Sequence, residues 1–274
     1  MTKPISTATA LQIFTSDSEH FLAHFWEFFS LVAFGDIKLS QKLYDHLATI
    51  DILPWQSPLV EIGRAKLLSI SGQLFDCHKS FQNISQQLYT LPEFPSPNIR
   101  NEISAFLNYE RILLATKIED YQQAEFYLHA GNNLTSIKNF SLAFELQDAF
   151  TQTKHNPNEL ASLISTSIKL EEAGVPALAC FGWRTAGIVS RKAKKYSIAE
   201  EHYNKALSIA KKNNLKLLMM QVYIALASLN STIGESHNAR NILDMVKFSS
   251  PLDPVIPSKY EILALIESRE GNID

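Results

Sequence analysis

The chain has 274 residues, of which 46% are hydrophobic, a length that is long for one compact domain and ordinary for an elongated helical array. Only 9 glycines and 11 prolines are present, too few for a sandwich or barrel built from many short strands. The formal net charge of −3 predicts no general affinity for nucleic acid or for an anionic membrane.

The sequence predicts a cytoplasmic protein. Residues 1–14 (MTKPISTATALQIF) hold one lysine and no long apolar core, unlike a signal peptide. No run approaches the roughly 18 apolar residues that a transmembrane helix needs. Two cysteines cannot build a disulfide framework, which fits a reducing compartment. Cys77 and Cys180 fall at predicted helix-packing positions, so we expect buried rather than reactive thiols.

Apolar residues recur with helical spacing along most of the chain, and strand-like alternation is nearly absent. The predicted helices arrive in pairs joined by short turns such as Ser71-Gly72. The longest connection, residues 91–98, contains three prolines, and its apolar residues predict a loop on the surface. A second break, residues 249–257, precedes the last helix. In chain order the predicted helices cover residues 18–34, 37–50, 57–71, 74–90, 99–117, 121–135, 137–153, 158–173, 176–193, 197–212, 214–233, 236–247 and 257–269.

One helix pair carries a distinctive spacing of large and small residues. Trp183 and Gly187 lie one helical turn apart, and Ala199, Tyr203 and Ala206 follow Gly187 by 12, 16 and 19 residues. This spacing resembles the tetratricopeptide repeat (TPR), which has a large residue at position 4, small residues at 8 and 20, an aromatic residue at 24 and alanine at 27. Two helices can cross closely only where side chains are small, so we expect Gly187 and Ala199 at the crossing.

The same register extends over about six repeats, with gaps of 37 to 47 residues between them. Position 20 is small throughout: Ser40, Cys77, Ala124, Ala161, Ala199 and Ala239. Position 8 is filled by Phe28, Ala65, Ile112, Ala149, Gly187 and Ala227. Position 24 is filled by Tyr44, Phe81, Leu128, Ser165, Tyr203 and Leu243. The long period of about 38–40 residues resembles the superhelical domain of maltose-regulator-type bacterial activators, without their ATPase and DNA-binding modules.

The TPR resemblance implies an all-α, right-handed superhelix of about six antiparallel helix pairs over residues 18–256, plus a C-terminal capping helix. No single pair can bury its apolar face, so stacked pairs would share one core. Residues 1–17 would form an N-terminal segment that covers the aromatic first helix. Residues 257–274 would either cap the stack or begin a seventh repeat of a longer protein.

The sequence carries few patterns that are typical of catalytic or metal-binding sites. His20, His24 and Glu27 share one helical face and could bind a metal, but the metalloprotease helix has its glutamate between the histidines, so an ordinary helix surface is the favoured interpretation. No phosphate-binding loop or nucleophile elbow is present. We therefore expect no enzyme, no cofactor and no metal site.

Positive charge is concentrated in residues 184–216, which hold nine bases and two acids. A solvated turn over residues 191–195, with cations at a helix C-terminus, is the simplest interpretation. A site for an acidic partner is the alternative. Nucleic acid is less favoured, because the stretch lacks interleaved aromatic residues and the whole chain is acidic.

In TPR arrays the first helix of each pair lines the concave face, and the resemblance implies exposure at positions 2, 5, 9 and 12. Packing in the core is the alternative for any one of these residues. The clamp by which some TPR proteins hold a C-terminal carboxylate is not reproduced, because Ile188 stands where asparagine is expected. The expected partner-binding residues are Phe106, Tyr109, Leu113, Leu146, Phe150, Phe181, Arg184, Ile188, Arg191, Lys192 and Gln221.

These observations predict a non-catalytic scaffold that binds a peptide or protein partner in a concave groove. The partner would be acidic if residues 184–216 take part in binding. A regulatory sensor domain, which binds a small signal and controls an effector, is the alternative. Neither a nucleic-acid partner nor a membrane partner is expected.

Overall fold

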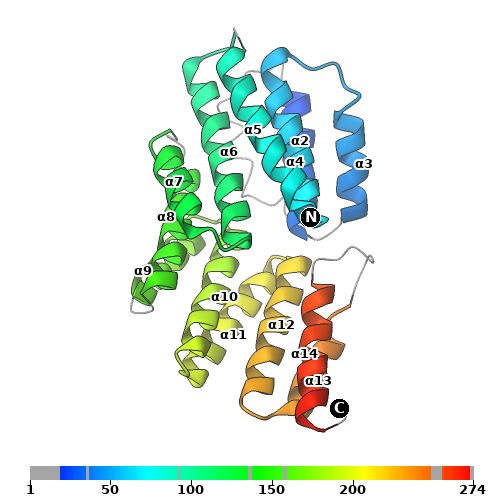
Figure 1. Cartoon of the computed structure of the whole chain (residues 1–274), viewed down its shortest axis with the longest axis vertical. Helices are drawn as coiled ribbons and strands as arrows, with labels where there is room; N and C mark the ends of the chain where they lie inside the picture. The colour runs from blue at the N-terminus through cyan, green and yellow to red at the C-terminus, as the bar shows by residue number, and fades with distance from the viewer. Residues whose placement is uncertain are drawn as a thin grey trace. The chain divides into compact units, whose positions relative to one another are not determined.

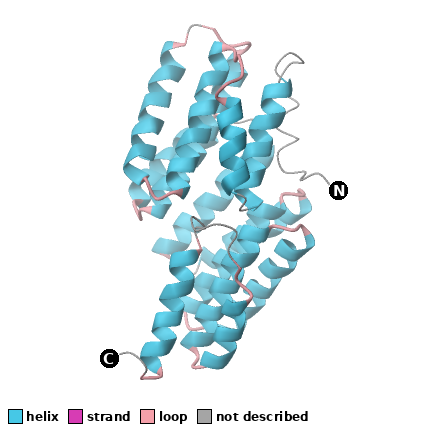
Figure 2. Ribbon diagram, turned by 90° about the vertical axis from the view of Figure 1, so that its right-hand side faces the viewer, coloured by secondary structure: helices cyan, strands magenta, loops and turns pink. Residues whose placement is uncertain are grey.

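The computed structural model of the chain describes residues 19–34, 37–91, 93–134, 138–156, 159–247 and 255–271. The regular elements in these ranges are all helical, as the sequence predicts (Figure 2). With the labels of Figure 1, they are α2 (Glu19–Phe34), α3 (Ile37–Leu47), the short 3-10 helix η3 (Pro54–Gln56), α4 (Ser57–Ile70), α5 (Leu74–Thr90), α6 (Pro97–Lys117), α7 (Tyr121–Asn132), α8 (Lys138–His155), α9 (Leu160–Glu172), α10 (Pro176–Lys192), α11 (Tyr196–Lys212), α12 (Lys216–Thr232), α13 (Ser236–Asp244) and α14 (Ile256–Arg269).

All thirteen predicted helices are present, and their ends agree with the predicted ranges within three residues. Helix α6 begins at Pro97, two residues early, because Ser96 caps it: the backbone N–H of Ile99 donates to Ser96 Oγ at 3.4 Å. The remaining proline loop is held against the protein. Phe94 packs on the core, and the guanidinium carbon of Arg100 lies 4.6 Å from its ring centroid.

The chain divides into two compact units. The first unit consists of residues 1–32 and 38–151, and the second of residues 33–37 and 152–274. One continuous array over residues 18–256 therefore stays a prediction.

Within each unit the helices pack as consecutive pairs. Helix α4 packs on α5, α6 on α7, α10 on α11 and α12 on α13. The first helices of neighbouring pairs also contact one another: α4 contacts α6 in the first unit, and α10 contacts α12 in the second. Within each unit, the first helices of neighbouring pairs thus lie side by side in one layer, as stacked repeats require (Figure 1).

Aromatic residues of α2 form much of the core of the first unit. Phe25 and Phe28 are fully buried and belong to one cluster with Ile62 of α4 and Phe81 of α5. The sequence predicts that this aromatic helix is covered, and α4, α5 and α6 contribute the covering residues of the cluster. The predicted N-terminal cover, residues 1–17, lies outside the described residues.

The close crossing expected in the second unit is confirmed. Ala199, Tyr203 and Ala206 of α11 are fully buried, and Gly187 of α10 faces the ring of Tyr203. A Cβ atom on Gly187 would lie 2.4 Å from two ring carbons, so no other side chain fits there without a shift.

The predicted register holds in most repeats and fails in the fourth. All six residues assigned to position 8 are buried, and so are five of the six at position 20. The exceptions lie on α9, where Ala161 and Ser165 are exposed. The buried residues of α9 include Leu163, Ser167 and Leu170, so the predicted register of this helix is wrong by two residues.

Six helix ends share one turn geometry. Each is followed by a residue with positive φ, and the next residue donates its N–H to a carbonyl five positions back, as Gln73 does to Leu68 at 2.9 Å. This is the Schellman arrangement. Glycine fills three of these positions without strain, while three side-chain-bearing residues adopt the same conformation at some cost. The six positions are Gly72, Glu119, Gly174, Lys194, Asn214 and Gly234.

Helix α14 packs on α12 and α13. Ile262 and Ile266 bury their side chains in one cluster with Ala227, Ala239 and Leu243. At the edge of this contact, Arg240 of α13 forms hydrogen-bonded ion pairs of 2.5 Å with Glu267 of α14 and with Glu270, which directly follows α14. Helix α14 therefore packs against the last helix pair, and its assignment as a cap or as the start of a further repeat stays a prediction. None of the described helices combines the length and apolar character that crossing a bilayer takes.

Candidate functional site

Over residues 179–191, helix α10 presents a single accessible stripe of side chains. Phe181, Arg184, Ile188 and Arg191 are half-buried and follow one another at spacings of 3, 4 and 3 residues, so they share one helical face. Every other residue between positions 179 and 190 is buried. We call these four residues the inner stripe; all four are among the predicted partner-binding positions.

Helix α12 extends the same surface. Gln221, another predicted position, is half-buried, and so is Ser228 two turns further along. Arg191 joins the helices, because its Nη1 donates to Ser228 Oγ at 2.9 Å and to Thr232 Oγ1 at 3.5 Å. The inner stripe and this part of α12 are therefore neighbours on one surface of the second unit.

Arg184 differs from Arg191 in having no hydrogen bond or ion pair with any described residue, whereas the Nε atoms of both arginines are buried without a partner. Its guanidinium carbon lies 5.5 Å from the ring centroid of Phe181. Burial lowers the pKa of the Arg184 guanidinium, and the nearby Cys180 and Tyr203 act in the opposite direction. Arginine stays protonated at neutral pH, so the stripe holds a partly desolvated cation.

The opposite side of α10 is fixed by a polar network. Trp183 donates its indole Nε1 to Glu171 Oε1 at 2.7 Å, and Lys205 Nζ lies 3.3 Å from Glu171 Oε2. The ring of Trp183 also contacts the ring of His202, with centroids 5.6 Å apart. These contacts join α9, α10 and α11, and they set the rotation of α10 that turns the inner stripe outward.

The remaining bases of residues 184–216 behave largely as a solvated surface. Helix α10 ends at Lys192, and residues 192–195 are all exposed, as the solvated-turn interpretation predicts. Among the described residues, only Lys205 of the nine bases pairs with a carboxylate. The half-buried Arg184 and Arg191 do not fit this interpretation, and their position calls for another explanation.

In the first unit, two predicted groove residues lie in the core. Phe106 is 7% exposed, and its ring meets Phe29 of α2 at a centroid distance of 5.1 Å. Tyr109 is 9% exposed and meets Phe144 of α8 at 5.9 Å. The expectation that Phe106 and Tyr109 line an open groove is therefore corrected: α2 and α8 cover them.

The other predicted positions of this unit are mixed. Leu146 of α8 is fully buried, so it too is a core residue rather than a lining residue. Leu113 of α6 and Phe150 of α8 are half-buried and keep an accessible part. A binding role for these two residues stays a prediction.

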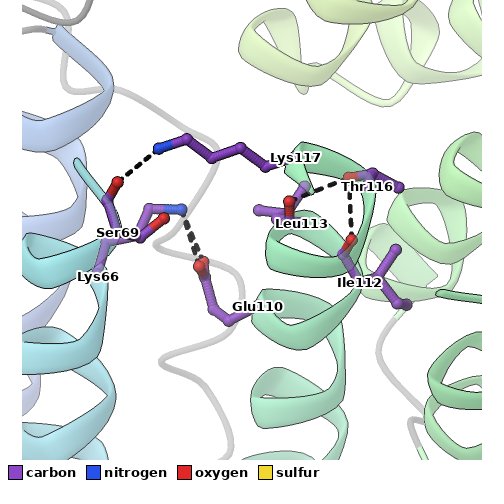
Figure 3. Close-up of polar contacts among 7 residues, drawn as sticks. All are labelled: Lys66, Ser69, Glu110, Ile112, Leu113, Thr116 and Lys117. Carbon is purple, nitrogen blue, oxygen red and sulfur yellow. Dashed lines mark hydrogen bonds and ion pairs between the residues drawn. The ribbon is translucent and has the colours of Figure 1, made fainter. Parts of the chain in front are cut away.

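A polar cluster between α4 and α6 was missed by sequence reasoning. Lys66 Nζ donates to both carboxylate oxygens of Glu110, at 2.8 and 3.1 Å, and the Glu110 side chain is only 6% exposed (Figure 3). Lys117 Nζ donates to the carbonyl of Ser69 at 2.5 Å. Burial, and then the charge of Lys66, lowers the pKa of Lys117. Because Lys66 and Glu110 are 44 residues apart, only helix packing brings them together.

The cysteines and histidines show no reactive arrangement. Cys77 and Cys180 are buried, and burial raises their pKa values to about 11 and about 12, so both thiols stay protonated at neutral pH. Within the described residues there is no group of three or more metal-ligating side chains. His24 Nδ1 lies 3.4 Å from Glu27 Oε2, and the side chain of His20 lies outside the described part.

Consecutive helix pairs, small residues at helix crossings and first helices in one layer define a TPR-like helical array. No family model matches the chain, and no curated protein matches its sequence. Among solved structures, the crystal structure of NprR in complex with its cognate peptide NprX matches with a TM-score of 0.69 and covers 97% of this chain and 77% of that chain. The two sequences are 14% identical, so the likeness concerns the fold.

Proposed function

We propose that this chain is a non-catalytic scaffold that binds a peptide or protein segment along the inner stripe and the adjoining face of α12. One observation carries the proposal: between residues 179 and 190 of α10, the accessible side chains are confined to the inner stripe. This stripe alternates apolar and cationic groups, which a surface with no partner does not need.

The alternation suits an extended ligand. Phe181 and Ile188 offer apolar contact, and Arg184 offers a planar group that donates several hydrogen bonds. The neighbour NprR was crystallised with a cognate peptide, which supports a peptide as the kind of ligand that such an array holds. The narrower resemblance to maltose-regulator-type superhelical domains stays a prediction.

Positive charge on this surface favours an acidic partner. Residues 184–216 carry nine bases against two acids, and the two arginines of the inner stripe lie half-buried within it. Affinity should fall as salt rises, because partly exposed charges are screened over about 8 Å at physiological ionic strength. A partner without negative charge would gain no electrostatic attraction from these arginines and lysines.

Peptide selection followed by site-directed variants tests the proposal. A random peptide library displayed on phage is panned against the intact chain, and the selected peptides are synthesised and titrated by fluorescence anisotropy. Ile188→Glu, on the inner stripe, should weaken binding at least about tenfold, because it places a carboxylate beside the apolar contact.

The matched control is Ile198→Glu, which makes the same change at a residue of α11 that is 40% exposed. It should leave peptide affinity unchanged. Failure to select any peptide would overturn the proposed function. So would equal losses from the two variants, because binding would then not depend on the inner stripe.

A further inference from the structure

Arg184 is the one arginine of the chain without a polar partner among the described residues. The chain has seven arginines, all in the described ranges. Six of them donate to a carbonyl or hydroxyl oxygen or pair with a carboxylate. These are Arg64 with Glu61, Arg100 with the Leu91 carbonyl, Arg111 with the Phe81 carbonyl, Arg191 with Ser228, Arg240 with Glu267 and Glu270, and Arg269 with Ser231.

An unpartnered guanidinium costs free energy when part of it is removed from water. The Nε of Arg184 is buried, and no described carboxylate lies within ion-pair distance of its guanidinium. The group cannot avoid the cost by losing its proton, because arginine stays charged at neutral pH. A partner that brings its own carboxylate would satisfy the donors and recover that cost.

The surroundings of Arg184 define the shape of such a partner. Phe181 precedes it by one turn and Ile188 follows it by one turn on the inner stripe, so apolar residues stand on both sides of Arg184 along this helical face. A peptide backbone that entered this space would leave its own N–H groups without partners. A side chain with two or three rotatable bonds can reach the guanidinium while its backbone stays at the surface.

We infer that Arg184 is the recognition site for an aspartate or glutamate side chain inside a bound peptide, paired through the guanidinium fork and flanked by Phe181 and Ile188. This inference rests on the proposed function and names the chemistry of its ligand. Arg191 has a different role, because its Nη1 is already engaged by Ser228 and Thr232. It is a positioning residue that holds α10 against α12 and so fixes the inner stripe relative to the adjoining face of α12.

Isosteric peptide pairs test the inference. Each peptide selected on the wild-type chain is synthesised with its acidic residue and with the matching amide, Glu against Gln or Asp against Asn. Both ends are blocked by acetylation and amidation, so that the side chain is the only carboxylate that changes. The wild-type chain should bind the acid form about tenfold or more tightly than the amide form.

Variants of Arg184 complete the double-mutant cycle. With Arg184→Gln the acid and amide peptides should bind alike, because the charged fork is gone. Arg184→Lys keeps the charge but offers no fork, so the difference should shrink without vanishing. Lys212→Gln removes the same charge from an exposed residue of α11 and should keep the full difference. Urea unfolding of each variant checks that the fold is intact.

Three results would overturn the inference while the proposed function stands. The acid–amide difference could persist in Arg184→Gln, the selected peptides could lack acidic residues, or an unblocked C-terminal carboxylate could restore the binding of the amide peptide through Arg184. Selection of no peptide by the wild-type chain would overturn the proposed function and this inference together.

Discussion

The ring of Tyr203 lies directly on the backbone of Gly187. A Cβ atom on residue 187 would stand 2.4 Å from both Cδ1 and Cε1 of that ring, closer than carbon atoms approach. This contact sets how closely α10 and α11 approach each other.

Gly187→Ala should therefore destabilise the protein by roughly 1–3 kcal/mol, because the added methyl group overpacks a buried crossing. Urea unfolding, followed by circular dichroism, measures the change. Gly63→Ala on α4 is the control, since its Cβ would meet Phe28 and Tyr44 at 3.4 and 3.5 Å, which is ordinary contact. That variant should be neutral or more stable by up to about 1 kcal/mol, from helix propensity. Equal stability of the two variants would contradict the crossing.

Sequence patterns predicted this crossing because it depends on residue size at fixed spacing within one helix pair. The same reasoning failed on α9. That helix carries small residues on both faces, among them Ala161 and Ser165 outside and Ser167 inside, and no aromatic residue marks the buried face. Where size does not vary around a helix, spacing alone leaves the register undetermined.

Helix α14 supplies a pair of adjacent positions with opposite environments. Ile266 is fully buried against α12 and α13, whereas Leu265 is 49% exposed. Ile266→Ala should cost about 2 kcal/mol or more and lower solubility, because it opens the apolar face of the last helix pair. Leu265→Ala should change stability by less than about 0.5 kcal/mol. Calorimetric melting compares them, and equal melting temperatures would show that α14 does not stabilise the stack.

The turn between α10 and α11 holds Lys194 at a φ of 59°, which is left-handed backbone. Lys194→Gly should raise stability by about 1 kcal/mol, because glycine adopts this conformation without the steric penalty of a Cβ. Lys195→Gly, at a φ of −89°, should bring no gain. The urea midpoints of both variants are compared with wild type; a loss of stability in Lys194→Gly would mean that the lysine side chain contributes at the turn.

His202 predicts a pH dependence of stability. It is 9% exposed beside Trp183, and its Nδ1 lies 3.3 Å from Ser190 Oγ. Burial lowers the pKa of His202 below its ordinary value of 6.5, against a hydrogen bond to the Ala186 backbone and the charge of Glu201. Below about pH 6.5 the unfolded chain binds a proton that the folded chain excludes, so stability falls as pH falls.

Unfolding free energies at pH 7.5 and pH 5.5 measure this effect. The wild-type chain should lose more stability between the two values than His202→Gln, which has no titrating ring at this position. An identical loss in both proteins would assign the pH dependence to other groups.

The candidate site was predictable only in part. On α10, the repeat register correctly identified Phe181, Arg184 and Ile188 as accessible. It did so because the helices that cover the rest of α10 belong to its own pair and to the neighbouring pairs. Phe106 follows the same rule on α6 and is nevertheless buried, since rings of α2 reach across to it. A register that considers only adjacent repeats contains no information about such contacts. The pairing of Lys66 with Glu110 joins adjacent repeats, but it was missed because the register assigns positions by residue size and does not match charged side chains between α4 and α6.

The two arginines of the inner stripe should respond in opposite ways to the same substitution. Arg184→Met replaces an unpartnered, half-buried guanidinium with an apolar side chain of similar length, so the free protein should become more stable by about 1 kcal/mol. Arg191→Met loses the hydrogen bonds to Ser228 and Thr232 and should become less stable by a similar amount. Urea unfolding without any peptide present measures both changes.

A gain of stability on removing Arg184, combined with a loss of peptide binding, is the signature of a residue kept for recognition, because stabilising changes at binding sites commonly cost function. Destabilisation by both substitutions would instead mean that Arg184 has a structural role in the folded chain, and it would overturn Arg184 as a residue kept for recognition.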